Sequence, residues 1–178
     1  MPQPDDRDSV IEGSEPPSAE LLAKAGELIA NVELVNVRPC DIQASIEAGV
    51  APGAVVSLVK METALSYAAQ EGVYGNRIDF RFELLGEAAD LKLGQVSFSL
   101  LVDYDVTEGF TPDEAAAEFV TGTTGYFAAY PYARELFTSL AVRLQFDPVV
   151  IGLLKRGSLR PGSINVVRCL GDPVDEPA

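Results

Sequence analysis

The sequence predicts an α+β fold, because three patterned regions follow one another along its 178 residues. Apolar residues recur at helical spacing near the start, alternate with polar residues through four stretches, and return to helical spacing around residue 130. Alternation is typical of strands with one buried face, and short turns between them favour antiparallel pairing. We expect an N-terminal helix, then a four-stranded antiparallel meander sheet covered on one face by a long kinked helix.

The first predicted helix spans residues 19–31. Ser18 suits the N-cap position, since its hydroxyl accepts a hydrogen bond from an unsatisfied backbone N–H of the first turn. An apolar stripe at helical spacing indicates a surface helix with one buried face. The stripe consists of Leu21, Leu22, Ala25, Leu28 and Ile29.

The first predicted strand, residues 32–46, changes parity in its middle. Its apolar residues are odd-numbered just before Pro39 and even-numbered from Cys40 to Ile46. One extra residue in a strand turns the following side chains to the opposite face, so this change indicates a β-bulge. Because proline has no backbone N–H to donate, the strand is expected at an edge of the sheet.

Three further strands are predicted after a turn at residues 49–53. Apolar and polar residues alternate through 55–67, 74–84 and 96–106. The even-numbered residues of the second and third of these runs are mainly apolar, and charged residues lie between them. This arrangement predicts a sheet with one covered face and one face in water.

The helical cover is predicted to begin at residues 111–114, Thr-Pro-Asp-Glu. This sequence is typical of a capping box, with Thr111 at the N-cap and a proline in the first helical position. Gly122 weakens the helix, and a longer helix is expected to start just after it and to reach about Phe146. Pro131 lies inside that helix and predicts a kink or local unwinding, because it lacks a donor and crowds the preceding turn.

Composition narrows the class of protein. The formal net charge is −14, and the sequence contains neither histidine nor tryptophan. The absence of histidine excludes imidazole bases, histidine-containing triads and histidine-ligated zinc sites. Strong acidity argues against nucleic acid as a partner, since phosphate contacts need Lys and Arg. Phosphate-loop and serine-elbow motifs do not occur, so we expect a binding protein without a cofactor.

The acidity is concentrated at the two ends. Residues 1–20 carry a net charge of −5 and residues 171–178 carry −3, and both are rich in proline. Such segments are typical of solvated, disordered tails. The expected organisation is therefore a disordered tail over 1–18, one domain over 19–170, and a second disordered tail over 171–178.

Cysteine usage and hydropathy predict a cytoplasmic protein. Cys40 and Cys169 are far apart and form no CxxC motif, so two thiols in a reducing compartment are expected. The acidic start MPQPDDRDSV has no apolar stretch and is not expected to be a signal peptide. Apolar runs are too short for a membrane span of roughly 18 residues, so no membrane insertion is expected.

The long helix contains the most specific motif. Residues 130–135 read Tyr-Pro-Tyr-Ala-Arg-Glu, and Leu140, Arg143, Phe146 and Pro148 follow. This pattern resembles the SecB family of export chaperones, which carry a PYARE-type sequence in their long helix and four antiparallel strands before it. The added helix over 19–31 is more similar to the divergent SecB-like chaperones associated with toxin–antitoxin systems. Residues 143–170 depart from the family, since they carry a net charge of +4.

The resemblance implies an ATP-independent holdase. Family members are homotetramers, built as dimers of dimers, in which edge strands pair across one interface and long helices pack at the other. Unfolded polypeptides lie in hydrophobic grooves, and the acidic outer sheet face contacts the translocase ATPase SecA. The expected groove residues here are Tyr126, Phe127, Tyr130, Val149, Val150, Ile151, Leu153 and Leu154. The expected docking acids are Asp41, Glu62, Asp79, Glu83, Asp103 and Asp105, and Pro131, Tyr132, Arg134 and Glu135 form the structural motif.

Each of these assignments has a simpler alternative. The aromatic groove residues are also suitable core or interface residues, and the acids also suit a solvated sheet face. Arg134 and Glu135 are adjacent on a helix and point about 100° apart, which favours a structural role over a catalytic pair. Asp103 and Asp105 share a strand face and could bind a hard cation, although two carboxylates are weak evidence for a metal site.

The predicted function is therefore a chaperone that holds unfolded or nascent polypeptides and hands them to the export machinery. A dedicated chaperone of an antitoxin is the first alternative. A non-chaperone α+β domain that binds a small ligand, or an enzyme using Asp and Glu, is the further alternative.

Overall fold

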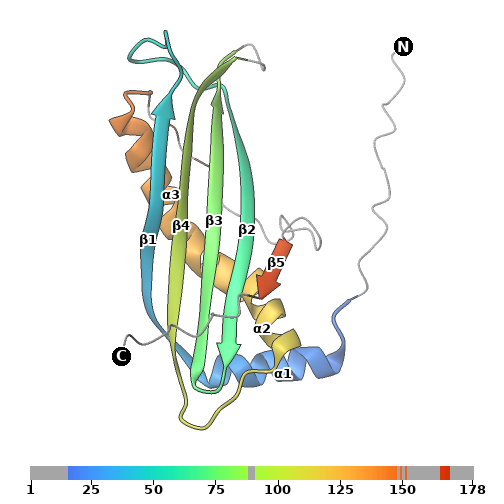
Figure 1. Cartoon of the computed structure of the whole chain (residues 1–178). Helices are drawn as coiled ribbons and strands as arrows, with labels where there is room; N and C mark the ends of the chain where they lie inside the picture. The colour runs from blue at the N-terminus through green and yellow to red at the C-terminus, as the bar shows by residue number, and fades with distance from the viewer. Residues whose placement is uncertain (1–15, 88–90, 148, 150, 152–164, 169–178) are drawn as a thin grey trace, which may run out of the picture.

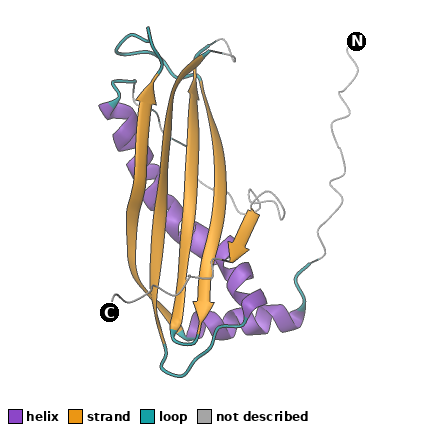
Figure 2. Cartoon of the chain, in the orientation of Figure 1, coloured by secondary structure: helices purple, strands orange, loops and turns teal. Residues whose placement is uncertain are grey.

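A computed structural model describes residues 16–87, 91–147, 149, 151 and 165–168 (Figure 1). Residues 165–168 are described by their backbone alone. It confirms the expected α+β class: an N-terminal helix, an antiparallel sheet and a long helix across one sheet face (Figure 2). The helices are α1 (Ala19–Ala30), α2 (Glu114–Val120), a π-helical turn (Thr121–Gly125) and α3 (Tyr126–Arg143). The strands are β1 (Val32–Ile46), β2 (Leu58–Gln70), β3 (Val73–Leu85), β4 (Lys92–Val106) and β5 (Asn165–Arg168).

The strand order is β1-β4-β3-β2-β5, which differs from a simple meander. β2, β3 and β4 pair in sequence, as expected, but β1 pairs with β4. Residues 47–57 carry the chain from one edge of the sheet to the other (Figure 1). Gly49 and Gly53 give this connection two sharp bends, at φ 88° and 78°, where other residues would be strained. The predicted turn at residues 49–53 is present, but it belongs to a crossover connection rather than to a hairpin.

β1 has the edge position and the bulge that its sequence predicts. Its register with β4 shifts between Cys40 and Gln43, just after Pro39, and Asp41 there has a φ of 52°. A second shift, next to Leu34, was not predicted. The two irregularities bend the strand and interrupt its ladder of backbone hydrogen bonds.

The core lies between the sheet and α3. Phe80, Phe82 and Phe98 project from β3 and β4, and all are at most 2% exposed. The ring of Phe137 on α3 is 4.5 Å from that of Phe82, so the helix packs directly on this aromatic layer. The alternation predicted for these two strands is therefore confirmed. A second cluster joins α1 and α2 to the other end of the sheet, with Leu28 fully buried.

The start of α2 corrects the predicted cap. The N-cap is Asp113, whose carboxylate accepts a hydrogen bond of 3.0 Å from the backbone N–H of Ala116, so the helix begins two positions later than the Thr111 box implies. Asp113 also pairs with Lys24 of α1 at 3.1 Å. Aspartate suits this N-cap position because its one carboxylate accepts from the end of α2 and also pairs with a lysine of α1.

The break near Gly122 takes the form of a π-helical turn, after which α3 runs without interruption through Pro131 to Arg143. The local unwinding expected at Pro131 is therefore not found, and the irregular turn lies at the weak point expected near Gly122. None of the described helices is long and apolar enough to cross a membrane. Both expected tails lie largely outside the described residues, which begin at 16 and end at 168.

Candidate functional site

Exposed apolar side chains lie beside the sheet where the crossover enters β2. Val55, Leu58 and Met61 are 59%, 47% and 39% exposed. We call these three residues the β2 corner. Leu58 and Met61 differ in parity, so they project to opposite faces at the start of β2, where exposed apolar side chains are typical of a contact site for another polypeptide.

The β2 corner is open because α3 crosses the sheet obliquely (Figure 2). The helix packs chiefly on β4, with further contacts to β1 and β3. Met61 lies on the same face of β2 as buried Leu65. The alternation of β2 implied that a helix covers this whole face, but near the start of the strand none of the described helices does. Sequence reasoning missed the corner for that reason: the pattern of β2 shows which face is apolar, whereas the helix path decides which part is covered.

The predicted groove residues of α3 are not all on the surface. Tyr126 is 1% exposed and Tyr130 is buried, so both are core residues in this chain, as the simpler alternative held. Phe127, by contrast, is 42% exposed. Tyr126 bonds through its hydroxyl to Thr63 of β2, and burial raises the pKa of both tyrosines. The helix start is thereby tied to the β2 side of the sheet.

The predicted groove residues after α3 are only partly described. Ile151 is buried in the core cluster, and Val149 is half-buried against it. Val150, Leu153 and Leu154 lie outside the described residues. Val149 and Ile151 therefore pack as core residues, and a groove role for the segment stays a prediction.

The exposed face of the sheet is less uniformly acidic than its sequence implies. Arg77 of β3 is the centre of a network: its guanidinium donates at 2.9 Å to Asp41 of β1, to Asp79 and to the hydroxyl of Ser99. The pKa of Arg77 is raised, chiefly by its bond to Asp79. This network joins three strands across the solvent face.

Other predicted docking acids also have cationic neighbours. Asp103 accepts from Arg38 at 3.1 Å, and Glu83 lies 3.9 Å from Lys92. Glu62 and Asp105 are exposed. Since most of these carboxylates face an Arg or a Lys, the surface presents alternating charge. Its role in docking a partner stays a prediction.

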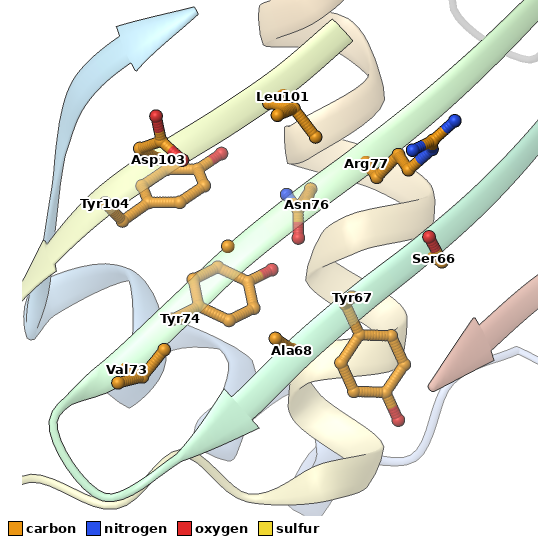
Figure 3. Close-up of a pocket in the computed structure, with 11 residues that line it drawn as sticks. Ser66, Tyr67, Ala68, Val73, Tyr74, Asn76, Arg77, Leu101, Asp103 and Tyr104 are labelled. Atoms are coloured by element: carbon orange, nitrogen blue, oxygen red, sulfur yellow. The ribbon is translucent and has the colours of Figure 1, made fainter. Parts of the chain in front are cut away.

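The same face carries a shallow hollow near the β2–β3 turn, shown in Figure 3. Its volume is about 400 Å³. Ala68, Val73 and Leu101 provide an apolar lining, and Arg77 and Asp103 are charged residues beside it (Figure 3). Its size and chemistry suit a single apolar side chain near a charged group. Among the residues that the structure describes, no cluster of three or more Cys, Asp or Glu is arranged to hold a metal ion.

The PYARE motif lies at the middle of α3. Pro131 and Glu135 are exposed, Tyr132 is 47% exposed, and Arg134 is half-buried. The backbone carbonyl of Arg134 accepts a hydrogen bond of 2.9 Å from Thr138. The motif thus presents most of its side chains on the surface of the helix that faces away from the aromatic core.

A buried polar network supports the π-helical turn from below. Thr121 donates at 2.8 Å to the side-chain oxygen of Asn76, so the hydroxyl of Tyr74, 3.0 Å from Thr121, must be the donor in that second contact. Thr121 is fully buried and Asn76 is 3% exposed. These three side chains fix the turn, and hence the start of α3, on β3.

A second group of exposed apolar residues follows the free edge of β1. Leu34, Val35, Ile42 and Ile46 are all exposed, although the strand belongs to the sheet. Their position beside an open strand edge is typical of a protein–protein interface.

The geometry defines a class of protein: an antiparallel sheet of four long strands, extended by the short parallel β5, with a long helix across one face and exposed apolar residues at the outer strands. The comparisons agree with this class. The chain is 37% identical to the SecB-like chaperones Rv1957 and MT2006, from two strains of Mycobacterium tuberculosis, over 71 residues. That match spans 39% of this chain and only 39% of each relative. No family model matches the sequence.

The fold comparison covers more of the chain. A solved structure of the Mycobacterium tuberculosis Rv1957 SecB-like chaperone, in complex with a ChAD peptide from the HigA1 antitoxin, aligns with a TM-score of 0.62 at 21% identity. The alignment covers 75% of this chain and 98% of that one. The expected resemblance to divergent SecB-like chaperones is therefore confirmed, in a partial sequence match and in the fold.

Proposed function

We propose that this chain is a chaperone that holds an unfolded segment of an antitoxin, without nucleotide and without catalysis. The observation that carries the proposal is the exposed β2 corner on a scaffold shared with a SecB-like chaperone solved with an antitoxin peptide. This reading is favoured over the general export holdase, the first expectation from sequence, because that structure contains an antitoxin segment rather than an export client.

The physical basis is apolar contact. Unfolded polypeptides expose apolar side chains, and burying them against Val55, Leu58 and Met61 gains about 25 cal/mol for each Å² removed from water. Such apolar contacts tolerate many client sequences. Hydrogen bonds between the client backbone and a strand edge add affinity without requiring a particular sequence. The net charge of −14 keeps a chain with exposed apolar groups soluble through mutual repulsion.

We also propose that the chain assembles as a dimer of dimers. The exposed apolar residues of β1 suit pairing of two edge strands, and Phe127, Tyr132 and Val142 leave apolar side chains exposed on α3 for a second contact. Leu34→Asp with Val35→Asp should then reduce the native mass measured by light scattering by about half. An unchanged mass would place the interface elsewhere.

The dedicated role is tested by comparing clients. The chain is mixed with the HigA1 antitoxin, whose ChAD peptide the solved SecB-like complex contains, and with several unrelated proteins diluted from urea, and light scattering follows aggregation. A dedicated chaperone protects the antitoxin at far lower concentration than the other proteins. Equal protection of all would favour the general holdase, and protection of none would contradict the proposed function.

A further inference from the structure

The two outer long strands offer very different edges. All 13 residues of β2 pair with β3 in an unbroken register, from Leu58 with Leu85 to Gln70 with Val73. β1 has two register shifts and contains Pro39. A regular edge presents backbone donors and acceptors at the spacing that an added strand requires. β2 is therefore the better template for strand addition.

Part of the β2 edge is already used in this way. The short strand β5 lies parallel to β2, with Asn165 to Arg168 opposite Ala64 to Tyr67 (Figure 1). The first half of β2, from Leu58 to Thr63, lies outside this pairing. It contains two of the exposed residues of the β2 corner. One continuous edge thus has a part that pairs with β5 and a part, Leu58 to Thr63, that pairs with no second strand among the described residues.

The pairing with β5 is suited to exchange. It involves 4 residues, and parallel ladders are slightly less stable per residue than antiparallel ones. A longer segment that also covers Leu58 to Thr63 gains more backbone hydrogen bonds and buries Met61 as well. An extended client therefore has more to gain from this edge than β5 has.

We propose that the β2 edge is a strand-addition site for an extended, apolar polypeptide segment, and that β5 is its intramolecular competitor. The inference rests on the proposed function. It adds two points: the place where the client backbone is held, and the competitor that limits client binding. A client strand that runs beyond Thr63 must displace β5. The apparent affinity is then reduced by the fraction of molecules in which β5 occupies the edge.

The test weakens β5 and measures binding. Val166→Pro with Val167→Pro removes two of the four backbone N–H groups of β5, and Val166→Thr with Val167→Thr keeps them and is the matched control. The probe is a fluorescein-labelled peptide of alternating valine and threonine, long enough to cover Leu58 to Tyr67, and its binding is followed by fluorescence anisotropy. The proline variant should bind about threefold or more tightly than the natural chain and the threonine control.

A covalent variant tests the same competition in the opposite direction. Ser66 and Val167 are register partners, so Ser66→Cys with Val167→Cys places two thiols for a bridge that holds β5 on β2. Cys40→Ser and Cys169→Ser remove the natural thiols. The oxidised variant should bind the peptide several-fold more weakly, and a reducing agent should restore its affinity.

The outcomes separate the two proposals. If the natural chain binds the peptide and neither the proline nor the oxidised variant changes the affinity, the competition by β5 is wrong and the chaperone function stands. If neither the natural chain nor the proline variant binds the peptide or an unfolded client, the proposed function and the inference both fail. Hydrogen exchange gives a second measurement: bound peptide should protect those backbone amides between Leu58 and Thr63 that point away from β3.

Discussion

A β-carbon on Gly125 would collide with the side-chain nitrogen of Asn76. The two residues come from the π-helical turn and from β3, and the absence of a side chain at Gly125 lets the backbone of the turn lie directly on the buried amide. This close approach fixes where α3 begins, and therefore which part of the sheet the helix covers. The openness of the β2 corner depends on that placement.

Gly125→Ala should destabilise the chain by about 1–3 kcal/mol, since an added methyl group overfills a packed site and Asn76 is held in place by Thr121. Gly26→Ala on α1 is the control, because a β-carbon there meets nothing within 4 Å. That variant should be stabilised by about 0.5–1 kcal/mol through helix propensity. Urea unfolding measures both, and equal effects would contradict the close approach.

Thr121→Val should cost about 1–3 kcal/mol, because it leaves the buried oxygen of Asn76 and the hydroxyl of Tyr74 without their shared partner. Thr124→Val changes an exposed threonine of the same π-helical turn and should alter the free energy of unfolding by less than about 0.5 kcal/mol. A Thr121 variant as stable as the natural chain would show that the network does not support the turn.

Stability should fall as the solution becomes strongly alkaline. Burial, and then the neighbouring Tyr74, raises the pKa of Tyr104 from 10.0 to about 12. The unfolded chain therefore releases this proton at a lower pH than the folded chain, so stability is lost as the pH rises from 10 towards 12. Tyr104→Phe should make unfolding less dependent on pH in that range. The same slope in both proteins would contradict the raised pKa.

Arg77→Gln should change the free energy of unfolding by less than about 1 kcal/mol, although the guanidinium makes three hydrogen bonds. The pairs lie in solvent, and 1 M salt should remove most of the difference by screening. A loss well above this value that persists in salt would mean that the network holds β1, β3 and β4 together.

The strands were predictable because one chemical rule acts on each residue. Ile78 and Phe82 point inward and Arg81 points outward, as alternation requires. Pairing partners were not predictable by that rule, since the glycines between β1 and β2 resemble those of a hairpin but belong to a crossover, which leaves β1 to pair with β4. β5 was missed for another reason: its 4 residues are too few to show a period.

The candidate site was less predictable than the fold. Tyr126 and Tyr130 have the chemistry of groove residues, but the buried start of α3 places them in the core. Met61 has ordinary strand chemistry and becomes a candidate site residue only because the helix does not cover it. Exposure is decided by how distant elements pack, and a single sequence contains no local pattern for it.

The most direct test of the account is the affinity for reduced, carboxymethylated lactalbumin, which stays unfolded in native buffer. Its binding is measured by fluorescence anisotropy for the natural chain, for Met61→Asp at the β2 corner and for Leu22→Asp, which changes a more exposed apolar residue on α1. The account predicts micromolar or tighter binding by the natural chain, at least a tenfold loss with Met61→Asp, and no change with Leu22→Asp. Absence of binding, or unchanged affinity in the Met61 variant, would contradict a client site at the β2 corner.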